Sequence, residues 1–279
     1  MGLLTDKDAL ARIQAATDYP LQRENDGWIV GHFFNCRLSS VYQPVFDVSE
    51  RQVIGHGAYV RSAPIGSDGA GEGALSPWGI FALAAEDPLL VRLDRLCRTL
   101  HALNYFSRVP PHQDLHVSVQ SRLLESVKDG HGRAFEKVLD LIGVETSRVV
   151  IEIPLEVNQD RRLLKHVIVN YRSRGYRIAC NHSGATEEWM AELGSLYPDV
   201  VRLELKALKR SGSKSLIEAI HRFGASLLVK GVETSEDVSA AVRAGADLLQ
   251  GRYLGEPTRS IESVSKRAAA DLQHPGYAW

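Results

Sequence analysis

The sequence predicts an α/β fold built from repeated strand–helix units, and three observations support this prediction. The second half alternates short apolar, β-branched segments with longer segments of helical period. The short segments carry consecutive apolar residues rather than a strict alternation, which is typical of parallel strands covered on both faces. With 279 residues, 44% of them hydrophobic, the chain can bury one barrel-sized core or two small ones. Periodicity alone leaves a barrel and a doubly wound sheet as alternatives.

A hairpin is expected ahead of the repeats, with strands over 39–47 and 53–61 around a short turn. The glycine-rich stretch 62–77 is most simply a surface loop rather than a phosphate-binding loop, because no GK[ST] or GxGxxG pattern follows it. Residues 78–106 predict one or two amphipathic helices, broken near Pro88. The strands expected in the repeats cover 115–119, 148–153, 176–180, 200–203, 225–229 and 247–249, and the clearest helices cover 161–174, 187–196, 215–223 and 235–244.

Composition excludes several classes of partner. Lys and Arg number 33 against 34 for Asp and Glu, so the formal charge of -1 gives no bulk attraction for nucleic acid or for an acidic membrane. The cysteines Cys36, Cys97 and Cys180 show no CxxC spacing, so neither a disulfide framework nor a zinc site is expected. No apolar segment is long enough to span a bilayer, and the start is not a signal peptide. We therefore expect a cytoplasmic protein whose amino terminus is a helix.

A series of motifs resembles the EAL domain family, the bacterial cyclic-di-GMP phosphodiesterases. VYQPVFD at 41–47 resembles the family's YQPIVD, GHGAYVR at 55–61 resembles GxEALxR, and LVKGVET at 228–234 resembles the stretch containing EGVET. Further matches lie, in the family's order, at 81–87, 92–95, 116–120, 150–155, 178–184, 202–204 and 250–257. The resemblance implies a (β/α)8 TIM-like barrel of the EAL type with an N-terminal hairpin. We predict one degenerate EAL domain over 36–279, after an extension over 1–35.

The resemblance also implies that the metal site of the family is changed here. Hydrolysis of a phosphodiester needs divalent ions, and Mg²⁺ or Mn²⁺ needs oxygen ligands, mostly carboxylates. Of the family's ligands only Glu152 is intact. We therefore expect no catalytic residue, no metal ligand set and no cofactor. The family's other acidic or amide residues are replaced by Gly57, Ser118, Leu155, Asn181, His182 and Lys230.

Because family barrels place their site at the carboxyl ends of the strands, Glu152, Asn181, His182, Glu204 and Lys230 are expected to converge there. Lys230 is predicted to pair with Glu152, with its ammonium near the position of a lost metal. Pairing of Glu152 with a neighbouring Arg is the alternative. Glu152, His182 and Glu204 could instead form a transition-metal site, although a lone His at a strand end is more often structural.

Arg61 and Arg202 are the best candidates for contacting phosphate, because the resemblance places both at positions that face the substrate's phosphates. Surface salt bridges are the alternative for each. Gln250 and Gly251 match the family's QG motif, in which the resemblance places the Gln near the ligand; a backbone-supporting role is the alternative. The complete set of ligand-binding candidates is Gln43, Arg61, Asp94, Glu152, Arg202, Lys230 and Gln250.

Three functions follow from the resemblance, in this order. The first is a catalytically inactive regulatory domain that binds another, unidentified protein. The second is a receptor that binds cyclic-di-GMP without metal and without hydrolysing it. The third is an active phosphodiesterase with an altered metal site. The resemblance also suggests a homodimer.

Overall fold

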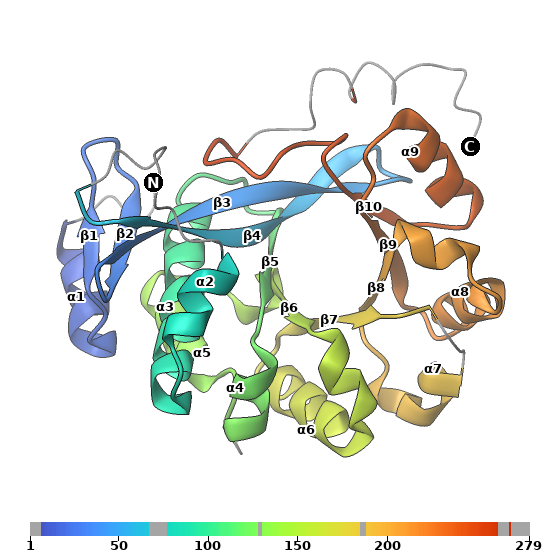
Figure 1. Cartoon of the computed structure of the whole chain (residues 1–279), viewed down its shortest axis with the longest axis horizontal. Helices are drawn as coiled ribbons and strands as arrows, with labels where there is room; N and C mark the ends of the chain where they lie inside the picture. Colours follow the sequence, from blue (N-terminus) through green and yellow to red (C-terminus); the bar gives the residue numbers. More distant parts are fainter. Residues whose placement is uncertain (1–6, 67–76, 128–129, 185–187, 262–267, 269–279) are drawn as a thin grey trace.

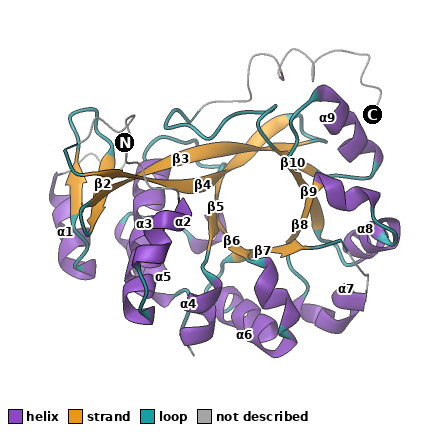
Figure 2. Cartoon of the chain, in the orientation of Figure 1, coloured by secondary structure: helices purple, strands orange, loops and turns teal. Residues whose placement is uncertain are grey.

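The computed structural model describes residues 7–66, 77–127, 130–184, 188–261 and 268, and its centre is a closed eight-stranded barrel. Going around the barrel, the strands follow the order β3, β10, β9, β8, β7, β6, β5 and β4, and β3 also pairs with β4 to close the ring. Figures 1 and 2 look along the barrel, with helices arranged around its outside. The barrel prediction is therefore confirmed, and the doubly wound sheet is excluded.

The predicted hairpin forms part of the barrel wall. Strands β3 (Cys36–Asp47) and β4 (Gln52–Pro64) pair antiparallel along their whole length, with an irregularity between Val45 and Phe46. Strand β3 is also antiparallel to β10, whereas the other barrel pairs are parallel. One reversed strand lets the chain enter the barrel through a tight turn instead of a helical crossover.

The strand–helix repeats follow, close to their predicted positions. The chain leaves β4 through α2 (Pro77–Leu83) and α3 (Asp87–Phe106), which are separate helices, with Pro88 in the first turn of the second one. Most of the predicted stretch 62–77 lies outside the described residues. The remaining elements are β5 (Asp114–Ser118), α4 (Ser121–Ser126), α5 (Arg133–Leu141), β6 (Val149–Ile153), α6 (Arg161–Arg172), β7 (Arg177–His182), α7 (Glu188–Leu193), β8 (Val200–Glu204), α8 (Ser213–Arg222), β9 (Ser226–Lys230), α9 (Ser235–Arg243) and β10 (Leu248–Gln250).

The amino-terminal extension contains more structure than the sequence indicated. Helix α1 (Lys7–Thr17) confirms the predicted terminal helix, but β1 (Leu21–Arg23) and β2 (Ile29–Phe33) were not anticipated. Strand β2 pairs with the start of β3 and continues the sheet beyond the barrel (Figure 1). The domain boundary at residue 35 falls in the turn between β2 and β3 and stays a prediction.

The core has two parts, inside and outside the barrel wall. Alternate strand residues such as Ile151, Ile178 and Val201 pack against the surrounding helices in the large outer cluster. The residues next to them point to the opposite face and fill the barrel interior. This small inner cluster consists of Val45, Val150, Ala179, Val200, Leu228 and Leu248, with Ile54 packed against it.

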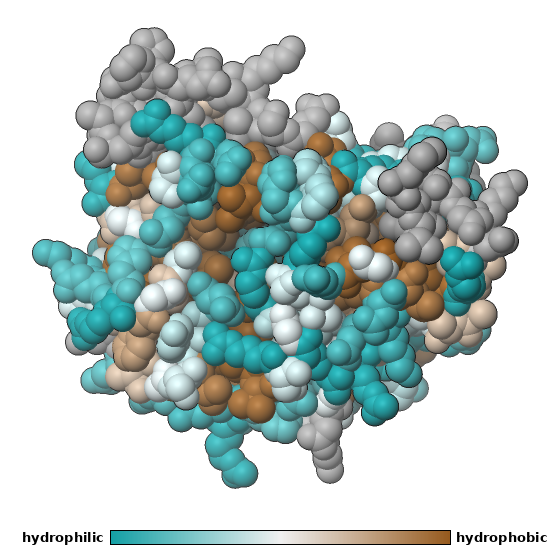
Figure 3. Space-filling view, turned by 180° about the vertical axis from the view of Figure 1, so that it is seen from behind, coloured by the Kyte–Doolittle hydropathy of each residue, from teal (hydrophilic) through white to brown (hydrophobic). Residues whose placement is uncertain are grey.

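The surface opposite to the view of Figure 1 is mostly hydrophilic, and hydrophobic residues appear on it in separate groups (Figure 3). Among the described residues, no helix combines the length and apolar character needed to cross a membrane. Cys36, Cys97 and Cys180 are buried free thiols.

Candidate functional site

A polar layer lies directly above the inner apolar cluster, at the carboxyl ends of the strands. Side chains along a strand alternate between faces, so the residue two positions after each inner apolar residue also points inward. This rule places Glu152, Asn181, Arg202, Lys230 and Gln250 together, two positions after Val150, Ala179, Val200, Leu228 and Leu248 respectively. The structure therefore brings together most of the residues that the sequence predicted to converge.

Glu152 is the centre of this layer, and its partner is Arg202. Both side chains are almost completely buried, and Arg202 Nη1 forms an ion pair with Glu152 Oε2. Ser118 Oγ donates a second hydrogen bond to the same carboxylate oxygen at 2.6 Å. Burial alone would raise the pKa of Glu152, but the charge of Arg202 with smaller contributions from its neighbours holds that pKa below its usual range. Glu152 is therefore a stable buried carboxylate with a cation already beside it.

Lys230 does not pair with Glu152, so the predicted ion pair is wrong. Its Nζ lies 2.9 Å from Glu204 Oε1, and these side chains are 27% and 49% exposed. The physical reason is the strand order, because Lys230 and Glu204 lie opposite each other on adjacent strands β9 and β8. Glu152 is on β6, three strands away from β9, and the alternative pairing with a neighbouring Arg is the one present.

His182 does not join the converging residues either. It follows Asn181 on β7 and therefore points to the other face. There its ring packs against Trp189 on α7, with 4.6 Å between the two ring centroids. The Gly184 N–H donates to His182 Nδ1 at 3.0 Å, and burial lowers the pKa of His182 to about 4. The prediction that His182 lies with Glu152 is wrong, and the alternative, a hydrogen-bonded structural histidine, is confirmed. Asn181 points inward and donates to the Ile153 carbonyl at 3.0 Å.

Gln250 fills the space beside Gly57. A Cβ atom at Gly57 would lie 2.6 Å from Gln250 Nε2, and Gln250 Oε1 accepts a 3.0 Å hydrogen bond from Arg202 Nη2. Gln43 lies on the neighbouring strand β3, where its Nε2 donates to the Gly255 carbonyl at 3.0 Å. The amide of Gln250 therefore extends the Glu152–Arg202 pair across the barrel.

Tyr59 was not predicted as a site residue, although it lies on the inner face of β4 two residues after Gly57. Burial, reinforced by the nearby charge of Glu152, raises the pKa of Tyr59 to about 12. His116, two residues before Ser118, is a second missed residue. Its Nδ1 is 3.9 Å from Glu152 Oε1, too long for a hydrogen bond, and burial lowers the pKa of His116 to about 3. Period-two counting from Gly57 and Ser118 would have identified both.

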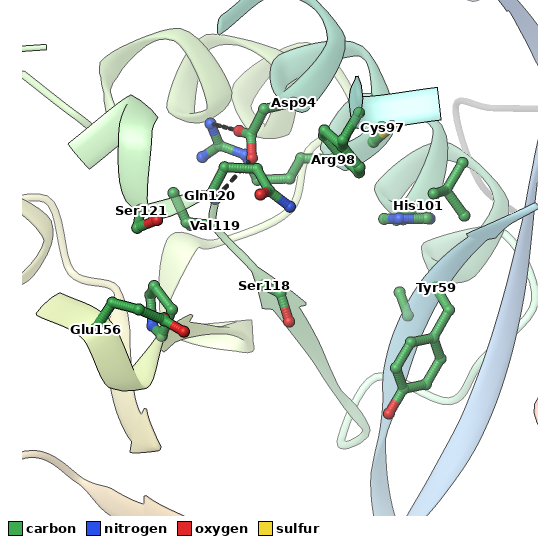
Figure 4. Close-up of a pocket in the computed structure, with 14 residues that line it drawn as sticks. Tyr59, Asp94, Cys97, Arg98, His101, Ser118, Val119, Gln120, Ser121 and Glu156 are labelled. Carbon is green, nitrogen blue, oxygen red and sulfur yellow. Dashed lines mark hydrogen bonds and ion pairs between the residues drawn. The ribbon is translucent and has the colours of Figure 1, made fainter. Parts of the chain in front are cut away.

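A cavity of about 450 Å³ opens beside the polar layer, between β4, β5 and α3. Figure 4 shows Ser118 and Tyr59 on one side of it and the Asp94–Arg98 pair of α3 on the other. Asp94 Oδ2 lies 2.5 Å from Arg98 Nη2, and Asp94 Oδ1 accepts a 3.2 Å hydrogen bond from the Gln120 N–H. Asp94 therefore lines the cavity, but its charge is balanced within α3.

Arg61 lies further out, near the mouth of the barrel. It is four residues beyond Gly57 on β4, about 13 Å along the strand. The period of two puts Arg61 on the same face as Gly57 and Tyr59. Its side chain is exposed. Within the described residues, this side chain forms a single hydrogen bond, from Nη1 to the adjacent Val60 carbonyl at 3.3 Å.

The sequence matches the model of the EAL domain family over residues 30–257, which is most of the chain. The uncharacterized EAL-domain containing protein YkuI of Bacillus subtilis (strain 168) is 26% identical over 235 residues, which cover 79% of this chain and 55% of that protein. The chain thus spans about half the length of this curated relative.

Solved structures show the same fold. The B. subtilis YkuI structure, in complex with its substrate c-di-GMP and calcium, is 25% identical with a TM-score of 0.67, covering 84% of this chain and 60% of that one. A standalone EAL protein from Vibrio cholerae O395 in a c-di-GMP-bound form is 15% identical with a TM-score of 0.61, covering 82% of this chain and 95% of that one. At 15% identity the likeness supports the fold alone.

Proposed function

Because this chain belongs to the EAL domain family, we propose that it is a catalytically inactive member that works as a regulatory signalling domain by binding another protein. The observation that carries this proposal is the buried ion pair between Glu152 and Arg202. A guanidinium already neutralises the charge of the carboxylate that would have to bind a metal. Any metal ion at Glu152 would first have to displace this cation.

The residues around Glu152 do not fit a pair of hard divalent ions. Such ions need several carboxylate or other oxygen ligands, and a nearby fixed cation repels them. Arg202 lies beside Glu152, and Lys230, which pairs with Glu204, is a second cation in the same layer. Gly57 offers no ligand, and Gln250 occupies the space into which a side chain there would extend. No step of phosphodiester hydrolysis is therefore assigned to this site.

Incubation with cyclic-di-GMP and either Mg²⁺ or Mn²⁺ tests the absence of catalysis. We expect no linear product above the buffer control, and we expect Lys230→Glu alone to restore none, because Arg202 would still neutralise Glu152. Turnover by the unmodified protein that disappears in Glu152→Ala would show that the site is catalytic and would contradict the proposal.

A protein partner is favoured by exposed apolar side chains near the cavity. Leu83 ends α2 and is 45% exposed, and Leu155 follows β6 and is 39% exposed. Phe81, two residues before Leu83, and Pro154, directly before Leu155, line the cavity itself. Exposed leucines beside a partly apolar cavity provide the kind of anchor pocket found at protein interfaces.

Site-specific photo-crosslinking in the cells that make the protein tests this surface. A photoreactive residue at Leu155 should give a discrete adduct, and the same residue at Val169, which is 49% exposed on α6, should not. The adduct should disappear when Leu83→Glu is added. Equal crosslinking from both positions, or none from Leu155, would contradict a docking role for this surface.

Metal-independent binding of cyclic-di-GMP is the second candidate function. It is favoured by Arg61, which is exposed on the inward face of β4 and has no carboxylate partner among the described residues. The related YkuI structure holds c-di-GMP, although together with calcium. If this chain binds the nucleotide, affinity should be unchanged by EDTA, should weaken as salt rises, and should fall about tenfold in Arg61→Ala. An unchanged melting temperature with millimolar nucleotide would exclude the receptor.

A further inference from the structure

A second cavity of about 610 Å³ lies outside the barrel, where α1, α3 and α5 meet the turn before β7. It shares no lining residue with the cavity of the candidate site. Arg174 lies in that turn, on the amino-terminal side of β7, whereas the candidate site is at the carboxyl ends of the strands. The two cavities are therefore separate.

The wall of this second cavity is strongly basic. Four cationic side chains line it, and no carboxylate among the described residues does so. Arg174 forms an ion pair with Glu136, but the other three have no ion pair within the described part of the chain. The cationic residues are Arg95, Arg133, Lys137 and Arg174. This local charge contrasts with a net charge of only -1 for the whole chain.

Without an anion, this arrangement is electrostatically unfavourable. Arg133 and Lys137 are separated by one turn of α5, and like charges at this spacing destabilise a helix. The Nε groups of Arg95 and Arg174 are buried without a hydrogen-bond partner among the described residues. Since Arg133 and Ala134 are the first two residues of α5, the positive end of its dipole adds to the same field.

We propose that this cavity binds a small, multiply charged phosphate compound. Guanidinium groups suit phosphate because their paired N–H donors match its oxygens, and several cations in one cavity favour an anion with several charges. The volume lies within the range of small-molecule sites. A polyphosphate chain, free or as part of a nucleoside triphosphate, has the required chemistry. Tyr19 and Leu141 provide a less polar wall that a nucleoside could contact.

Titration with inorganic tripolyphosphate and, separately, with ATP tests this site by calorimetry and by melting temperature at low salt. We expect saturable binding of at least one of them and a raised melting temperature. Tighter binding of ATP would indicate a nucleotide, and equal or tighter binding of tripolyphosphate would indicate a free polyphosphate; either result supports an anion site.

The variants Arg133→Ala and Lys137→Ala identify the location of binding. Both side chains are exposed, so the changes should not disturb folding, and each should weaken binding by about tenfold. The matched control is Lys214→Ala on α8, whose side chain is 93% exposed and outside the cavity. Absence of saturable binding of either probe at millimolar concentration would overturn the proposal, as would equal losses in the cavity variants and the control.

Discussion

Glu152 is a buried carboxylate whose negative charge is balanced mainly by one residue, Arg202. The two side chains come from β6 and β8, with β7 between them, so only a long side chain can make the contact. The sequence predicted Lys230 at the carboxyl ends of the strands with Glu152 and left an unspecified Arg as the alternative partner, because it contains no information on strand register from which to choose between them. In the structure, Lys230 takes its direct neighbour Glu204. Partner choice in this layer therefore follows strand adjacency.

Replacing Arg202 tests how much the Glu152–Arg202 pair contributes to the stability of the protein. In Arg202→Met, Glu152 remains buried without a cation, and we expect a loss of about 3–5 kcal/mol in the free energy of unfolding at neutral pH. The measurement is urea unfolding. Lys230→Met is the control, because its half-exposed pair with Glu204 should contribute less than about 1 kcal/mol.

Adding Glu152→Gln to Arg202→Met should recover part of the lost stability, because no unpaired charge remains. The defect of Arg202→Met should also shrink as the pH falls, because burial then raises the pKa of Glu152 and protonation removes its charge. Equal effects of Arg202→Met and Lys230→Met would contradict the central role of this pair.

At the scale of elements, the sequence predicted the barrel strands better than the amino-terminal region. Strands β6 (VVIEI) and β9 (SLLVK) each contain three consecutive apolar residues, so their positions follow from the hydrophobic pattern. Strand β1 has only three residues, and β2 contains Gly31 and His32, so neither shows a clear strand pattern. The α-helix α7 ends at Leu193, earlier than the predicted helix 187–196. It ends there because the chain continues as a 3-10 turn from Gly194, whose φ is +57°.

The glycine of the QG motif, Gly251, is required because the backbone after β10 packs closely against the loop after β9. A Cβ atom at Gly251 would lie 2.0 Å from the Val232 carbonyl oxygen and 2.4 Å from its nitrogen. Backbone atoms cannot move aside as a flexible side chain could, so this contact requires glycine. The backbone-supporting role that the sequence left open is therefore favoured for Gly251, whereas Gln250 interacts with Arg202.

Gly251→Ala should consequently destabilise the protein by roughly 3 kcal/mol or more, because β9 and β10 must separate. Gly224→Ala is the matched control: its Cβ would meet open space, and only its φ of +78° would cause strain, costing about 1 kcal/mol. Thermal and urea unfolding of both variants provide the comparison. If the two losses were equal, the close approach to Val232 would not be what selects glycine at this position.

At the scale of the whole molecule, buried or partly buried neutral histidines make stability depend on pH. Burial lowers the pKa of His101 and of His116 to about 3, and that of His182 to about 4. In the unfolded chain these rings have a pKa near 6.5. Between these values the unfolded chain binds protons that the folded protein does not, so stability falls as the pH drops below about 6.5.

We expect the free energy of unfolding to decrease by several kcal/mol, as an order of magnitude, between pH 7 and pH 4.5. Urea unfolding at half-unit intervals measures this slope. His116→Gln removes one of the three rings and should flatten the slope, whereas His112→Gln removes an exposed ring and should leave it unchanged. A slope that is identical in all three proteins would show that His116 binds its proton equally in the folded and unfolded states. In that case the polar layer around Glu152 would be open to water, and the Glu152–Arg202 pair would contribute far less to stability than its burial implies.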